Sequence, residues 1–204
     1  MKKIFKTLVA AVALAAATTS ASAQLYLSGN FSMMHEGGED EATNTKKAPY
    51  NEFIIGTEIG YYFTDNMAVG ADINFEHRKS YQDADKKYWD ARNTLYFNPY
   101  FRFDFVSTEK ISFGAKAEAI LGFGKNKDQD DVTGKNSTFG VAIIPVLNYK
   151  FNSNWSAGVS FGRNGLSWRN TVNKDKDGKK IDNDSDLGVD LRLQSLTFSV
   201  VYTF

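Results

Sequence analysis

Residues 196–204 read LTFSVVYTF, a stretch in which almost every second side chain is apolar through to its end. This alternation has the period of a β-strand, because successive side chains of a strand point to opposite faces. The final residues of a soluble domain are usually polar and poorly ordered, so a strand that stays apolar to its end indicates an apolar environment along one whole face. The side chains on that face are Leu196, Phe198, Val200, Tyr202 and Phe204.

The same alternation recurs along the chain and predicts an all-β protein. Apolar side chains occupy one face of each predicted strand, and small or polar side chains occupy the other. We expect eight strands, near residues 25–34, 53–63, 67–76, 95–105, 111–121, 139–151, 155–161 and 196–204.

The connections between these strands alternate in length. TDN after Phe63, VSTEK after Phe105 and NSN after Phe151 are short turns. The other connections are long and rich in Asp, Lys, Asn and Gly, and they span residues 35–49, 78–90, 125–136 and 163–186. This plan is typical of an eight-stranded antiparallel transmembrane up-and-down β-barrel. A soluble eight-stranded barrel of the lipocalin type is the alternative.

Two features favour the membrane barrel. Glycine weakens a strand unless space is short, and the interior of an eight-stranded barrel is barely wide enough for side chains. The polar face carries Gly56, Gly60, Gly70, Gly114, Gly122, Gly140, Gly158 and Gly162. Aromatic rings favour the membrane interface, and they gather at the strand ends next to the short turns. These rings belong to Tyr61, Phe63, Phe103, Phe105, Phe113, Tyr149, Phe151, Trp155 and Tyr202.

The first 23 residues have the features of a secretory signal peptide. Three lysines precede an apolar run from Leu8 to Ala17, and Ala21-Ser22-Ala23 offers a cleavage site. We therefore expect residues 1–23 to be removed and residues 24–204 to form the barrel. That part has 21 basic and 24 acidic side chains, a formal net charge of −3, which suggests no nucleic-acid partner. The chain has no cysteine, which excludes disulfides and thiolate metal sites.

The C-terminal strand and its aromatic end carry a family resemblance. Alternating apolar residues ending on Tyr202 and Phe204 resemble the signal recognised by the barrel-assembly machinery of Gram-negative outer membranes. Together with the strand plan, they make the chain similar to the small eight-stranded outer-membrane β-barrel proteins, the OmpA/OmpX-like group in the broad sense. The resemblance implies a monomer in the outer membrane of a Gram-negative bacterium, surrounded by lipid and lipopolysaccharide, and we expect no cofactor.

Three positions depart from the strand pattern. Pro99 and Pro145 fall inside predicted strands, where a closed barrel has no free edge to accommodate a missing N–H donor, so we expect local bulges there. Residues 187–193 alternate out of step with residues 196–204. A one-residue bulge at Gln194 or Ser195 would restore both faces, or residues 187–193 project above the bilayer.

The inward face is predicted to hold an ion-pair network. Charges lie at similar heights on this face, at Glu58, Asp72, Arg102, Lys116 and Glu118, with Glu76 and Asp104 further along. Isolated charges there would be costly, so we expect acids of the second and third strands to meet bases of the fourth and fifth. Such a network would plug the lumen. A proton or ion path is the functional alternative.

A partial calcium-loop motif lies in the fourth long connection. Asn173, Asp175, Asp177 and Gly178 match the start of such a loop, in which alternate oxygens surround the ion. The match then weakens, because Asp184 stands where a bidentate Glu is expected and several lysines intervene. A solvated loop is the alternative, so we assign no metal.

Catalysis has little support in the sequence. Some small outer-membrane barrels modify lipid A with His, Ser and an acid, but this chain has only His35 and His77, both near the predicted outer rim. Neither forms a recognisable nucleophile-plus-base arrangement. The outer connections carry Tyr81, Tyr88, Trp89 and Trp168, which suit either surface contacts or an outer aromatic girdle.

The sequence therefore predicts a non-enzymatic outer-membrane barrel with a packed polar lumen and a structural or surface-interaction role. A porin-like channel for a small solute is the first alternative, and a lipid A-modifying enzyme is the second.

Overall fold

The protein is one antiparallel β-sheet that closes on itself. The structure, a computed structural model, describes residues 24–40, 45–82, 88–129, 131–160, 165–191 and 196–204. The strands are β1 (Gln24–Asp40), β2 (Thr45–Tyr62), β3 (Met67–Tyr81), β4 (Trp89–Ser107), β5 (Ile111–Asp128), β6 (Asp131–Lys150), β7 (Trp155–Ser160), β8 (Gly165–Asp175), β9 (Lys180–Asp190) and β10 (Thr197–Thr203). The expected signal peptide and the expected bulge at Gln194 or Ser195 lie outside the described residues.

The ten strands make an eight-stranded ring. Strands β1 to β6 pair in sequence order, and both β7 and β8 pair with β6, at different heights. Strand β9 pairs with β8, while β10 pairs with β7 and closes the ring on β1. Strands β7 and β8 thus share one position in the ring, and β10 and β9 share the next. Closure satisfies backbone N–H and C=O groups that hydrocarbon could not. The expected eight-stranded up-and-down barrel is confirmed.

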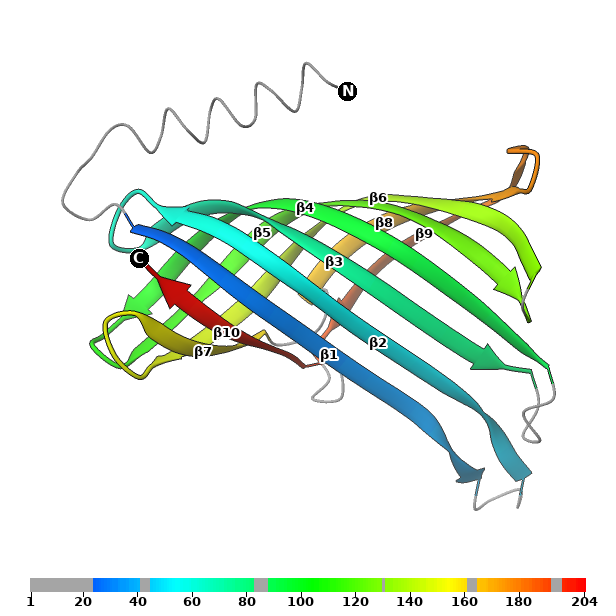
Figure 1. The fold of residues 1–204 in the computed structure, drawn as a ribbon, viewed down its shortest axis with the longest axis horizontal. Coiled ribbons are helices and arrows are strands. Elements are labelled where there is room, and N and C mark those ends of the chain that lie inside the picture. The colour runs from blue at the N-terminus through cyan, green and yellow to red at the C-terminus, as the bar shows by residue number, and fades with distance from the viewer. Residues whose placement is uncertain (1–23, 41–44, 83–87, 130, 161–164, 192–195) are drawn as a thin grey trace.

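The short turns and the long connections lie at opposite ends of the barrel. The start of β1, the end of β10 and the turn after β2 lie at the left in Figure 1, while the β8–β9 hairpin and the far ends of β1 and β2 lie at the right. Three short turns are closed by backbone hydrogen bonds, such as Phe63 N–H to Met67 O at 3.1 Å.

The long connections are mainly strand, which corrects the expectation of long polar loops. Strand β1 continues to Asp40 and β2 begins at Thr45, and the β8–β9 hairpin fills most of residues 163–186. Both faces of these extensions are polar, so they lack the alternation that marks a strand. Beyond Phe31, β1 pairs only with β2 among the described residues, and β9 pairs only with β8. The hairpins therefore project beyond the closed part of the ring.

The apolar face of the sheet points outward. Side chains such as Ile59, Ile73, Phe101 and Val141 are exposed along the outer wall, whereas charged residues lie among the buried ones. This is the reverse of a soluble barrel and gives lipid an apolar surface to contact. Among the described residues, no helix is both long enough and apolar enough to cross a membrane.

Aromatic rings surround the short-turn end of the barrel. Phe103 packs edge-on against Phe105 at 5.2 Å between ring centroids, and Tyr149 against Phe151 at 5.5 Å. Tyr202 contacts two further rings, those of Trp155 and Phe204, each at 4.9 Å. These rings form the inner aromatic girdle that the sequence suggests.

The two prolines cause no bulge, so that prediction is wrong. Pro99 faces Ala71 on β3 and Pro145 faces Ala115 on β5, and the register is unchanged on either side of each. The pairing of β4 with β5 skips Asn98 and Pro99, as expected when one donor is missing. Each strand therefore tolerates its proline by losing local bonding rather than by inserting a residue.

Glycines make room for tyrosines inside the barrel. A Cβ added at Gly60 would overlap the ring of Tyr26, and one at Gly70 would overlap the ring of Tyr100. Gly60 and Gly70 face each other across the β2–β3 pair, so together they form a flat floor under the two phenols. The close approach explains why this inward face needs glycine.

Candidate functional site

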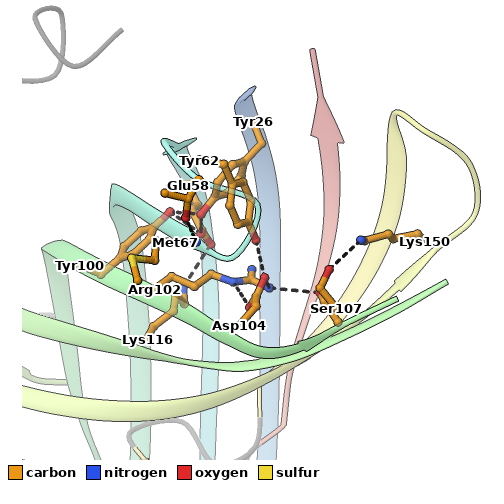
Figure 2. A network of polar contacts seen from close by, with 12 residues as sticks. Tyr26, Glu58, Tyr62, Met67, Tyr100, Arg102, Asp104, Ser107, Lys116 and Lys150 are labelled. Carbon is orange, nitrogen blue, oxygen red and sulfur yellow. Dashed lines mark hydrogen bonds and ion pairs between the residues drawn. The ribbon is translucent and has the colours of Figure 1, made fainter. Parts of the chain in front are cut away.

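The lumen contains a buried ion-pair cluster around Lys116 of β5. Its Nζ lies 3.2 Å from a carboxylate oxygen of Glu58 on β2, 3.2 Å from one of Asp72 on β3, and 3.3 Å from one of Glu118. Lys116 is only 7% exposed, and its three partners are equally buried. One ammonium group thus holds carboxylates from three strands together across the interior, as Figure 2 shows in part.

Two tyrosines complete the surroundings of Glu58. The hydroxyl of Tyr100 donates to Glu58 Oε1 at 2.6 Å, and that of Tyr26 donates to the same oxygen at 3.2 Å. The two hydroxyls also bond to each other, and Lys116 Nζ lies 4.7 Å from the centre of the Tyr100 ring. Because β1, β2, β4 and β5 all contribute, this cluster ties opposite walls of the barrel together (Figure 2).

A second cluster surrounds Arg102 of β4, nearer the short turns. Arg102 Nε donates to Asp104 Oδ1 at 2.8 Å, and the hydroxyl of Tyr62 donates to Asp104 Oδ2 at 2.9 Å. Asn148 of β6 lies beside the guanidinium, and its amide oxygen, when turned towards Arg102, accepts from Nη2 at 2.6 Å. Arg102 is 4% exposed, so its charge is compensated almost entirely by protein groups.

A third cluster lies towards the long-hairpin end. Arg78 Nε contacts Glu52 at 2.9 Å and Glu76 at 2.8 Å. Beyond these ion pairs, the amide of Asn136 donates to Asn126 at 2.9 Å, and Asn126 donates to Asn173 at 3.3 Å. Polar contacts therefore continue from one end of the lumen towards the other.

The structure brings four of the five predicted network residues into contact. Lys116 contacts Glu58, Asp72 and Glu118, whereas Arg102 forms its ion pair with Asp104 of its own strand. Sequence reasoning assigned the charges by alternation but did not include the tyrosines, which count as apolar in that pattern. Tyr26 and Tyr100 have the inward parity of their strands, so parity was the available signal.

A cavity with a free volume of about 90 Å³ lies among these clusters. Asp72, Asn74 and Asn98 line one side of it, and Ile120 and Ile144 line another. The apolar side belongs to a small buried core of Tyr96, Ile120, Ala142 and Ile144 inside the barrel. The cavity is small because side chains from every wall enter the lumen.

The two histidines each pair with an asparagine on the neighbouring strand. His35 Nδ1 lies 2.7 Å from Asn51 Oδ1, and His77 Nδ1 lies 2.6 Å from Asn93 Oδ1. Each pair is directly opposite in the strand register. These hydrogen bonds of the histidines thus lead to amides and to no serine or carboxylate.

The candidate calcium ligands lie along the β8–β9 hairpin. Asn173 faces Asp182 and donates to its carboxylate at 2.7 Å, while Asp175 Oδ1 accepts the backbone N–H of Lys179 at 2.8 Å. Asp177 is in the turn, and Asp184 faces Thr171 further down β9. Among the described residues, no group of three or more His, Asp or Glu side chains is arranged to hold a metal ion.

Aromatic residues also lie near the hairpin end. Lys79 Nζ lies 4.0 Å from the centre of the Trp89 ring and 5.1 Å from that of Tyr81. Trp168 packs edge-on against Phe139 at 6.0 Å, and its Nε1–H donates to Ser185 at 3.2 Å. These rings have an apolar face and a polar partner, as is usual at a membrane interface.

A closed antiparallel ring with an apolar outer wall, a polar lumen and an aromatic girdle defines a transmembrane β-barrel. The family model described as "Outer membrane protein beta-barrel domain" matches residues 6–204, so the chain belongs to that family and is an outer-membrane protein.

Solved structures with a similar arrangement include two outer-membrane proteins. The crystal structure of Neisserial surface protein A (NspA) gives a TM-score of 0.48 at 11% identity, covering 90% of this chain and 99% of that one. A major outer membrane protein from Thermus thermophilus gives 0.39 at 12% identity, covering 89% and 99%. Comparison with curated proteins gives no match.

Proposed function

We propose that this outer-membrane barrel has a structural or surface-interaction role, with a lumen that is plugged rather than open. The observation that carries the proposal is the Lys116 cluster, which joins four strands across the interior. A continuous water path would need these ion pairs to part, and separating a buried ion pair is costly. The Arg102 cluster forms a second polar layer nearer the short turns.

The projecting hairpins are the proposed interaction surface. Lys79, Tyr81, Trp89 and Trp168 provide cations and rings near the membrane rim. Such groups suit the phosphates and sugars of lipopolysaccharide. We further propose that the barrel acts as a monomer without a cofactor and is exported by residues 1–23. Insertion by the assembly machinery of a Gram-negative bacterium would use the C-terminal signal at Tyr202 and Phe204.

Conductance in planar lipid bilayers tests the plug. The purified protein should give no steady openings of nanosiemens size. A variant with both Tyr100→Ala and Lys116→Ala removes the centre of the cluster and should raise the conductance, which shows that inserted protein is being measured. Steady nanosiemens pores in the unchanged protein would refute the plug and establish the channel alternative.

The lipid A-modifying alternative is tested separately. The amide partners of His35 and His77 support a non-catalytic role for the rim histidines. Reconstituted protein incubated with lipid A should leave its acyl chains unchanged when the products are analysed by mass spectrometry. Deacylation or acyl transfer that is lost in His35→Ala or His77→Ala would overturn the non-enzymatic proposal.

A further inference from the structure

The central cavity of the lumen has two chemically different walls. Asp72 of β3 and Asn98 of β4 contribute oxygen atoms on one side, whereas Ile120 of β5 and Ile144 and Val146 of β6 contribute hydrocarbon on another. A cavity that held only water would be expected to be polar on all sides. The combination instead suits a molecule with one polar end and one apolar end.

The oxygen wall lacks hydrogen-bond donors. Asp72 and Asn98 are directly opposite each other in the β3–β4 pair and are 4% and 9% exposed. Within the described part of the chain, Oδ1 of each is buried without a hydrogen-bond partner, and so is Oδ1 of Asn74, two residues along β3. Leaving a buried acceptor unpaired costs about 1–3 kcal/mol. Three such acceptors beside one cavity indicate that a donor group is missing.

The charge of the same region indicates that this donor is a cation. Lys116 is the shared partner of three carboxylates, so the cluster has a formal net charge of −2. Glu58 has two tyrosine donors in addition, whereas Asp72 presents an unpartnered oxygen at the cavity. A positive group at that oxygen would offset part of the excess negative charge in a site of low dielectric constant.

We propose that the cavity binds a small organic cation, a primary ammonium group with a short apolar body. An ammonium group has three N–H donors and no acceptor, which matches the oxygens of Asp72, Asn74 and Asn98. The apolar body would contact Ile120 and Ile144. An inorganic cation would leave this hydrocarbon wall without a partner. The proposal goes beyond the structural role proposed above and does not depend on it, because a closed barrel and a conducting one can each hold a ligand.

NMR of the whole barrel in lipid nanodiscs tests the proposal, with n-butylammonium chloride as the probe and isoleucine methyl groups labelled. Saturable shifts are expected at Ile120 and Ile144, while the outward-facing Ile73 reports on partition into lipid. n-Butanol tests the need for charge, and sodium and calcium chloride test for an inorganic cation. Only the ammonium compound should shift the two lumenal methyl groups.

Two matched variants identify the oxygen that binds. Asp72→Asn removes one charge from the cavity wall and should weaken butylammonium binding by about tenfold or more, as expected for loss of a charge-assisted hydrogen bond. Asp104→Asn removes a charge from a residue that does not line the cavity and should leave binding unchanged. Absence of saturable shifts, equal shifts with butanol or calcium, or equal binding by both variants would overturn the proposal. The probe comparison on unchanged protein holds even if Asp72→Asn fails to fold.

Discussion

Replacing Lys116 by methionine should be strongly destabilising. The substitution keeps the length of the side chain but removes the ammonium group that lies within 3.3 Å of three carboxylates. Those carboxylates are 4–7% exposed, so water cannot replace the lost cation. Removing one partner of a buried ion pair typically costs about 3–5 kcal/mol, and three affected carboxylates place Lys116→Met at the upper end of that range.

The measurement is urea-induced unfolding of the barrel in lipid vesicles, followed by tryptophan fluorescence. Lys150→Met is the matched control, because Lys150 bonds only to Ser107 and to the Thr108 carbonyl at the membrane edge. A surface change of this kind is expected to stay within about 0.5 kcal/mol. Adding Asp72→Asn to Lys116→Met should recover part of the loss, because it removes one uncompensated charge. Equal stability of the two single variants would refute the view that Lys116 holds the lumen together.

Two further predictions concern the glycine floor and the outer wall. Gly70→Ala should lower the free energy of unfolding by about 1–3 kcal/mol through overlap with Tyr100, whereas Gly29→Ala, with no atom within 4 Å of the added Cβ, should cost less; equal losses in urea unfolding would contradict the packing. Ile73→Arg, midway along the lipid-facing wall, should cost about 2–4 kcal/mol, whereas Ile181→Arg in the projecting hairpin should cost about 0–1 kcal/mol, and the reverse order in the same assay would misplace the membrane.

The barrel could be predicted from the sequence because a membrane imposes one simple rule. Each spanning strand must present apolar side chains to lipid at every second position, and this alternation marks the residues whichever neighbours they pair with. Ile59, Ile73 and Val141 follow the rule and are exposed on the outer wall. Beyond the membrane the rule no longer applies, which is why the hairpin strands were interpreted as loops.

Contacts inside the lumen were harder to predict than its lining. Alternation places Arg102 and Glu58 on the inward face, but only three-dimensional stagger decides that Arg102 meets Asp104 while Lys116 meets Glu58. The tyrosine contacts depend on glycines of two other strands, and no local pattern encodes such a relation. The prolines were misjudged because a strand can lose one hydrogen bond without a change of register.

The pairing of β10 with β1 has a consequence for biogenesis. Tyr26 pairs with Thr203, and the backbone N–H of Phe204 bonds to the carbonyl of Leu25 at 2.9 Å, so the seam joins the two ends of the described chain. Contacts so distant in sequence form slowly, because a long loop must close before they can form. A ribosome-bound fragment that lacks β10 would have no partner for the β1 edge. Such a polypeptide would have to be held unfolded in transit until its synthesis had passed β10.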